Sequence, residues 1–317
     1  MSSFIDRRHL LSMSGAAAFA TLSTGLVGQT TASAADQSTP KLRYCFNTST
    51  IRGQNLPIEQ EVEIAAKAGY TGIEPWISKI QDYKDSGKSL HDLGKRIADL
   101  GLKVESAIGF AQWIVDDPEK RKTGLETAKR DMDLVASIGG TRIAAPPAGA
   151  TNGPKLDLLE VAQRYNALLQ VGDAAGVVPE LELWGFSTNL NRLGEVAMVV
   201  TEANHPSACM MPDVYHIYKG GSSFSGLEAI SGRVIPVFHM NDYPAEPPRD
   251  KINDSARVFP GDGVAPLKSM IQTLVGNGFQ GVFSLELFNP EYWKRDALEV
   301  AKEGLDKMKA SVESALS

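Results

Sequence analysis

Short apolar runs that alternate with longer segments of helical periodicity dominate this 317-residue sequence. This alternation predicts strands that are joined by helices, which is the pattern of a parallel sheet. Eight runs are candidate strands, at residues 42–47, 72–75, 103–107, 142–145, 177–184, 208–213, 234–241 and 282–288. The candidate helices between them cover residues 58–68, 90–100, 118–138, 156–175, 190–203, 266–277 and 295–315.

Several of the candidate helices end at a glycine, which readily adopts the left-handed conformation that stops a helix. These glycines are Gly69, Gly101, Gly139, Gly176 and Gly278. Eight strand–helix units in about 280 residues favour a closed barrel over an open, doubly wound sheet. The sequence also lacks the glycine-rich phosphate loops GxGxxG and GxxxxGK[ST] at the positions that nucleotide-binding sheets use. We therefore predict an α/β protein, a single-domain (β/α)8 TIM barrel over residues 35–317.

Residues 1–34 read as an export signal rather than as part of the barrel. Arg7 and Arg8 precede a weakly hydrophobic stretch, and Ala32 and Ala34 supply the small residues of a cleavage site. The paired arginines resemble a twin-arginine signal, which addresses folded proteins across a bacterial inner membrane. An uncleaved anchor is the alternative, but Ser, Thr and Gly interrupt the apolar run. We expect a periplasmic or otherwise exported protein without stable membrane insertion after signal removal.

The charge of the chain argues against one class of partner. Lys and Arg number 32 and Asp and Glu number 38, which gives a net charge of −6. Nucleic-acid binding requires clustered cations to neutralise phosphates, so we expect no nucleic-acid partner.

The C-terminal ends of the last four candidate strands carry polar residues in apolar surroundings. They are Glu182, Asp213, His239 and Glu286. In a closed barrel these strand ends meet at one rim. Buried carboxylates are costly unless they are paired or metal-bound, so the four together predict a shared divalent cation. Ligation that is rich in oxygen with one imidazole suits Mn²⁺, our first choice, as well as Mg²⁺ or Co²⁺, and Zn²⁺ remains open.

The order Glu, Asp-x-x-His, His-x-x-Asp, Glu along these strands resembles the xylose isomerase-like TIM barrel superfamily, in particular the sugar phosphate isomerase/epimerase family. The resemblance implies that Glu182, Asp213, His239 and Glu286 bind the metal. It also implies that Glu182 and Glu286 are the catalytic acid and base, and that His216 contacts the substrate. Glu180 has the same strand parity as Glu182 and is the alternative ligand if the register differs.

Further residues are candidates for contact with a small carbohydrate or keto-sugar. Trp113 and Trp184 lie beyond strand ends, where an aromatic face packs either on a sugar ring or on the barrel rim. Glu74 closes the second strand and either binds substrate hydroxyls or forms an ion pair. Asp242 could orient a ligand or a water molecule. Arg257 is a candidate substrate contact in a loop that forms a lid, a contact between copies in a homo-oligomer, or a plain solvated segment.

These features favour a metal-dependent sugar or polyol isomerase or epimerase that removes a proton next to a carbonyl and forms an enediolate. The same site could instead catalyse β-elimination, as a lyase or dehydratase that acts on 3-keto-glycosides or an inosose. A non-catalytic exported sugar-binding barrel is a further alternative. The related endonucleases need a histidine-rich zinc cluster, and this chain has 5 His, one of them in the expected signal.

Overall fold

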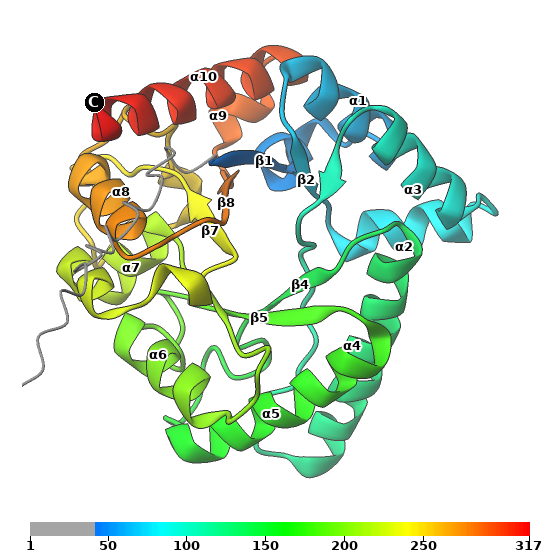
Figure 1. Ribbon diagram of the computed structural model, residues 1–317, viewed down its shortest axis with the longest axis vertical. Coiled ribbons are helices and arrows are strands. Elements are labelled where there is room, and N and C mark those ends of the chain that lie inside the picture. The colour runs from blue at the N-terminus through cyan, green and yellow to red at the C-terminus, as the bar shows by residue number, and fades with distance from the viewer. Residues whose placement is uncertain (1–41) are drawn as a thin grey trace, which may run out of the picture. The chain divides into compact units, whose positions relative to one another are not determined.

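The computed structural model describes residues 42–317, which belong to one compact unit. The expected signal at residues 1–34 lies outside the described residues. Eight parallel strands lie inside a ring of helices (Figure 1). The strands are β1 (Arg43–Asn47), β2 (Gly72–Glu74), β3 (Lys103–Val104), β4 (Arg142–Ala145), β5 (Val178–Glu182), β6 (Met210–Met211), β7 (Val237–Met240) and β8 (Val282–Leu285).

The helices occupy the connections that the periodicity predicts, with three short additions. The expected helices are α1 (Ile58–Ala68), α3 (Leu90–Asp99), α4 (Pro118–Ser137), α5 (Leu158–Ala175), α6 (Leu193–Glu202), α8 (Leu267–Gly276) and α10 (Ala297–Leu316). The additions are α2 (Ile77–Asp85), α7 (Val214–Gly220) and α9 (Pro290–Trp293). The described residues also form four 3-10 helices between these elements. They are η1 (Thr48–Gln54), η2 (Phe224–Ala229), η3 (Gly232–Val234) and η4 (Asp254–Ala256).

The sheet closes through irregular pairing at two seams. Hydrogen bonds order the strands as β3-β2-β1-β8-β7 in one arc and β4-β5-β6 in the other. At one seam, the His239 N–H donates to the Pro212 carbonyl at 2.9 Å. At the other, the Ala144 N–H donates to the Ala107 carbonyl at 2.8 Å. The arcs therefore form the closed TIM barrel that the sequence predicts.

Local chemistry sets the ends of these elements. All five glycines that were expected to stop helices have a positive φ, between 69° at Gly176 and 95° at Gly69. Helix α4 begins after Asp117, whose carboxylate accepts the N–H groups of Glu119 and Lys120. The expected strand 234–241 starts later, at Val237, because Pro236 has no N–H for the ladder and η3 ends at Val234.

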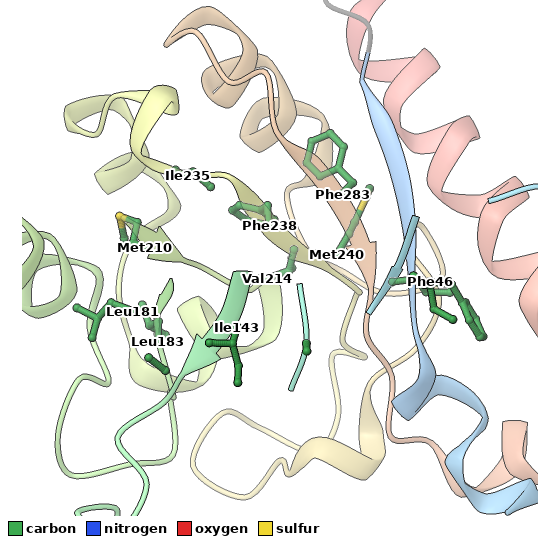
Figure 2. Close-up of a cluster of buried hydrophobic side chains, with 14 of the residues drawn as sticks. Phe46, Ile143, Leu181, Leu183, Met210, Val214, Ile235, Phe238, Met240 and Phe283 are labelled. Atoms are coloured by element: carbon green, nitrogen blue, oxygen red, sulfur yellow. The ribbon is translucent and has the colours of Figure 1, made fainter. Parts of the chain in front are cut away.

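The main hydrophobic core fills the space between the barrel and its helices. Figure 2 shows part of it, with Phe46 on β1, Ile143 on β4, Leu181 on β5 and Phe283 on β8. Side chains of opposite strand parity point into the barrel, where many are small or polar, such as Cys45 and Ser284. Within residues 42–317, no helix has both the length and the apolar composition to cross a bilayer.

Candidate functional site

Two carboxylates and one imidazole meet at the C-terminal end of the barrel. Glu182 ends β5, His239 lies in β7, and Glu286 follows β8. One ligand atom from each side chain lies within 4.8 Å of the other two. His239 Nδ1 is 3.2 Å from Glu286 Oε2 and 4.0 Å from Glu182 Oε1. All three residues are buried, and we call them the acidic floor.

The acidic floor has the properties of a cation site. Glu182 Oε2 and His239 Nδ1 are buried without a hydrogen-bond partner. Buried polar atoms normally have partners, and two neighbouring carboxylates repel each other unless a positive charge lies between them. Carboxylate oxygen and imidazole nitrogen are also common ligands of divalent metals. The residues present therefore fit a divalent ion.

Glu74 holds the His239 ring from below. His239 Nε2 donates to the Glu74 carboxylate, with distances of 3.1 and 3.2 Å to its two oxygens. Ser284 Oγ and Asn47 Nδ2 also donate to Glu74 Oε2, at 2.7 and 2.9 Å. This arrangement directs Nδ1 towards Glu182 and Glu286, as in proteins where a carboxylate orients a metal-binding histidine. Of the two roles expected for Glu74, the structure has the ion pair and not the substrate contact, because Glu74 is fully buried beneath His239.

Asp213 lies beside the acidic floor, but other groups engage both of its oxygens. It is the N-cap residue of α7, and Oδ1 accepts the His216 N–H at 2.6 Å. Oδ2 accepts from Asn241 Nδ2 at 2.7 Å and from Arg257 NH1 at 3.1 Å. The expected fourth metal ligand is therefore adjacent to the three-residue group and not part of it.

Arg257 supplies a buried positive charge from the loop after β7. Its NH1 donates to Glu286 Oε2 at 2.9 Å, and its NH2 pairs with Asp254. NH2 also lies 3.0 Å from His216 Nε2, which must accept that hydrogen bond. Burial, reinforced by Arg257, lowers the pKa of His216 and so favours the neutral ring that accepts. The structure thus brings Arg257 and His216 together beside the acidic floor, and their role as substrate contacts stays a prediction.

The two carboxylates of the acidic floor have opposite pKa shifts. Burial, followed by the negative charge of Glu286, raises the pKa of Glu182. Burial acts in the same direction on Glu286, but His239 and then Arg257 outweigh it and lower that pKa. Environments that separate two neighbouring carboxylates in this way are typical of acid–base pairs.

Glu180 lies one layer deeper in the barrel than Glu182 and away from the acidic floor. Its Oε2 accepts from Ser106 Oγ at 2.7 Å, and Oε1 lies 3.9 Å from Arg142 Nε. Burial raises the pKa of Glu180 to about 8. The structure therefore brings Glu182, and not Glu180, together with His239 and Glu286.

A cavity of about 490 Å³ opens above the acidic floor. Glu182, His216, Arg257 and Glu286 line its base. A chain of aromatic rings lines its wall, with centroid separations of 5.1 to 6.2 Å, through Phe288, Trp76, Phe110, Trp184 and Phe186. Trp184 lies in this wall, and its contact with a sugar ring stays a prediction.

Trp113 does not reach the cavity, which contradicts its expected role. Only 1% of its surface is exposed, and its ring packs 5.9 Å from that of Tyr165. Its Nε1 donates to the Pro146 carbonyl at 2.9 Å. The side chain therefore belongs to the main hydrophobic core instead of the rim.

Asp242 organises the loop after β7 instead of orienting a ligand. Its carboxylate accepts four backbone N–H groups at 2.8 to 3.1 Å, those of Tyr243, Gly261, Gly263 and Ala265. A Cβ atom at Gly263 would lie 2.3 Å from Asp242 Oδ1, so this close approach requires glycine. The expectation that Asp242 orients a metal ligand or water is therefore wrong.

Two asparagines that support the site were not among the predicted residues. Asn47 Nδ2 donates to Glu74 Oε2 and, at 3.1 Å, to Glu286 Oε1. Asn241 donates to Asp213 and accepts the Tyr215 N–H. Each asparagine directly ends an apolar strand, so the signal that identified Glu182 and Glu286 could also have found them.

Comparison with known proteins gives consistent matches. A family model described as xylose isomerase-like TIM barrel matches residues 62–311. The inosose isomerase of Bacillus velezensis is 25% identical over 276 residues, which cover 86% of this chain and 97% of that protein. A 3-dehydroshikimate dehydratase of Pseudomonas putida is 24% identical over 256 residues, which cover 78% of this chain and 39% of that protein.

A solved structure supports the fold. The crystal structure of the IOLI protein with a binding zinc atom superposes with a TM-score of 0.79 at 24% identity. The match covers 87% of this chain and 100% of the IOLI chain. The relatives that match over most of this chain are thus enzymes, an isomerase and a dehydratase among them.

Proposed function

Because the chain belongs to the xylose isomerase-like TIM barrel family, we propose that it is a divalent-metal-dependent isomerase or epimerase of a sugar or polyol. The observation that carries the proposal is the acidic floor, in which ligand atoms of Glu182, His239 and Glu286 lie within 4.8 Å of one another. These three residues would hold the ion, with Asp213 beside them. A bound divalent ion, for which we propose Mn²⁺, would supply Lewis-acid polarisation of a carbonyl group.

The chain's own residues would move the proton. One of Glu182 and Glu286 would accept a proton from the carbon next to the carbonyl, which leaves an enediolate, and the other would return a proton. The two residues come from β5 and β8, which β6 and β7 separate around the barrel, so they approach a ligand from different sides. Arg257 through Nε and His216 through Nδ1, two atoms that are buried without a hydrogen-bond partner, would hydrogen-bond to substrate oxygens at the base of the cavity.

The test follows the α-proton by NMR in D₂O with a panel of free ketoses. We expect the Mn²⁺-loaded protein to incorporate deuterium next to the carbonyl of at least one ketose. Glu286→Gln should slow this exchange by at least about 100-fold, since a positioned acid or base contributes roughly that factor or more. Glu291→Gln is the matched control, because Glu291 is an exposed carboxylate near the same strand end. Exchange that is equally fast in Glu286→Gln would refute the assignment.

Elimination by the same site is the second candidate, and the match to a dehydratase favours it. Removal of the same proton from a 3-keto-glycoside or an inosose would expel the β-substituent, so the protein would be a lyase or dehydratase. Product analysis by NMR with 3-keto-glucosides distinguishes the two reactions. Release of the aglycone supports elimination, and an epimeric product with the glycosidic bond intact supports epimerisation. Binding without exchange or release would instead support a non-catalytic sugar-binding barrel.

We further propose that residues 1–34 export the chain as a folded protein. The support is the sequence alone, Arg7 and Arg8 before a weakly apolar stretch. Replacement of both arginines with lysine should cause uncleaved precursor to accumulate in the cells. Processing that is unchanged in this variant would contradict a twin-arginine route.

A further inference from the structure

Arg52 is an exposed cation that lines the wall of the cavity, apart from the acidic floor. Its guanidinium carbon lies 4.7 Å from the Trp76 ring centroid and 5.9 Å from those of Phe288 and Trp293. These rings restrict the side chain on several sides. Among residues 42–317, its N–H groups have no hydrogen-bond acceptor. A planar guanidinium that is held in this way is suited to bind a carboxylate or phosphate with two parallel hydrogen bonds.

The other arginine of the cavity is already neutralised. Arg257 forms ion pairs with Asp213, Asp254 and Glu286. Arg52, in contrast, has no carboxylate within ion-pair distance in the described part of the chain. Negative charge therefore gathers at the base of the cavity, and an uncompensated positive charge lies on its wall.

The backbone around Arg52 is anchored, so the position of this charge is preorganised. Gln54 Nε2 donates to the carbonyls of Tyr292 and Arg295, both at 3.2 Å, and Trp293 Nε1 donates to the Ser49 carbonyl at 3.3 Å. A Cβ atom at Gly53 would lie 2.4 Å from the Trp293 ring, so η1 packs tightly on α9. Preorganised groups bind a ligand with less loss of conformational entropy.

Phe288 connects the two arginines. Arg257 Cζ lies 5.0 Å from the Phe288 centroid, and Arg52 Cζ lies 5.9 Å from the same point. A ligand that extends from the acidic floor past the Phe288 ring therefore reaches Arg52 at its far end. Arg52, Glu182 and Glu286 line the same cavity of about 490 Å³.

We propose that Arg52 is the specificity residue for an anionic group at the end of the substrate remote from the reacting carbonyl. The substrate class is then a keto-sugar with a terminal carboxylate or phosphate, a statement that rests on the proposed function for the position of the carbonyl. Charge at the far end would also orient the ligand, because only one direction pairs the anion with Arg52 and keeps it away from Glu182 and Glu286.

The test compares ligands that differ only at the far end. D-Fructuronate carries a carboxylate where D-fructose carries a hydroxymethyl group, and D-fructose 6-phosphate carries a phosphate there. We expect calorimetry on the full, Mn²⁺-loaded protein to give a Kd about 10- to 100-fold lower for at least one of the two anions than for D-fructose. The anion with the lower Kd identifies whether a carboxylate or a phosphate is preferred.

Variants separate charge recognition from packing. Arg52→Gln should abolish the preference, so that the Kd values of the anions and of D-fructose converge, and Arg52→Lys should retain part of it. Arg233→Gln is the control, because Arg233 lines a different cavity with Arg43, Lys103 and Arg142 and should not alter the preference. Thermal unfolding of each variant checks that the fold is intact.

Two results would overturn the proposal: equal affinity of the wild type for both anions and D-fructose, or an undiminished preference in Arg52→Gln. The outcome is separable from that of the proposed function. Anion preference without any α-proton exchange would support the role of Arg52 and contradict the isomerase. Exchange on ketoses without anion preference would support the isomerase and contradict the role of Arg52.

Discussion

Single side chains around His239, in β7, control the orientation and the pKa of its imidazole ring. His239 can form hydrogen bonds through both ring nitrogens, and Glu74 takes one of them. Burial alone would lower the pKa of His239, but the carboxylates of Glu286 and Glu74 raise it well above its ordinary value. The orientation and the pKa of His239 in the acidic floor therefore depend on Glu74, which is itself shielded from the cavity.

Replacement of Glu74 tests this dependence. Glu74→Gln keeps the shape of the side chain but removes the charge that orients His239. We expect Mn²⁺ affinity to fall by roughly 10- to 100-fold, the usual effect of removing such a supporting carboxylate. Titration of the metal-depleted protein with Mn²⁺ measures this change. The matched control is Glu291→Gln, and equal affinities in the two variants would show that Glu74 does not position the ligand.

Glu61 on α1 makes a prediction about pH that is independent of the site. Burial raises its pKa from 4.5 to about 7, and Oε2 has no hydrogen-bond partner. The folded protein thus holds this proton more tightly than the unfolded chain, so the group's contribution to stability is present below pH 4.5 and is lost as the pH rises towards 7. Glu61→Gln removes this loss.

Denaturant unfolding of the two proteins near pH 4 and near pH 8 measures the effect. Relative to the wild type, Glu61→Gln should gain about 3 kcal/mol of unfolding free energy between these pH values. The comparison across pH cancels any constant cost of burying the amide. A difference between the proteins that does not change with pH would mean that Glu61 titrates normally.

Among the elements, the loop after β7 supplies the positive charge that balances the carboxylates of the barrel. Asp242 holds the loop at its base and Arg257 returns to the acidic floor. Asp242→Asn should weaken the backbone hydrogen bonds and lower local stability by about 2 kcal/mol. Amide exchange at Gly261, Gly263 and Ala265 should then be roughly 30-fold faster. Asp250→Asn, an exposed change in the same loop, should leave these rates unaltered.

The elements also show what the sequence could and could not predict. Strands and long helices were predicted because apolar runs and helical periodicity extend over enough residues to be recognised. Helices α7 and α9, of 7 and 4 residues, are too short to display a period. The ligand candidates were found because a charged residue after an apolar run is unusual. The partners of Glu74 depend on contacts between strands, those of Asp242 on the course of its own loop, and those of Trp113 on packing against Tyr165. The order of residues along a strand reveals none of these.

For the whole molecule, a cation at the acidic floor would join β5, β7 and β8, which lie in both arcs of the sheet. Mn²⁺ should therefore raise the thermal stability of the entire barrel. At a concentration 100 times its Kd, an ion that binds only the folded state adds about 2.7 kcal/mol. Scanning calorimetry with Mn²⁺ and with a chelator measures the shift in Tm, which His239→Ala should greatly reduce. Identical Tm values in both conditions would argue against a metal at this place.

The origin of Arg257 has a consequence for protein engineering. Glu286 and Asp213 project from the barrel, while the guanidinium that separates them belongs to a connecting segment. Grafting the eight strands onto another scaffold would transplant an excess of negative charge, and the recipient would be expected to protonate or distort those side chains. A designer who wants to reuse this site must therefore carry over residues 241–265 as a unit with it.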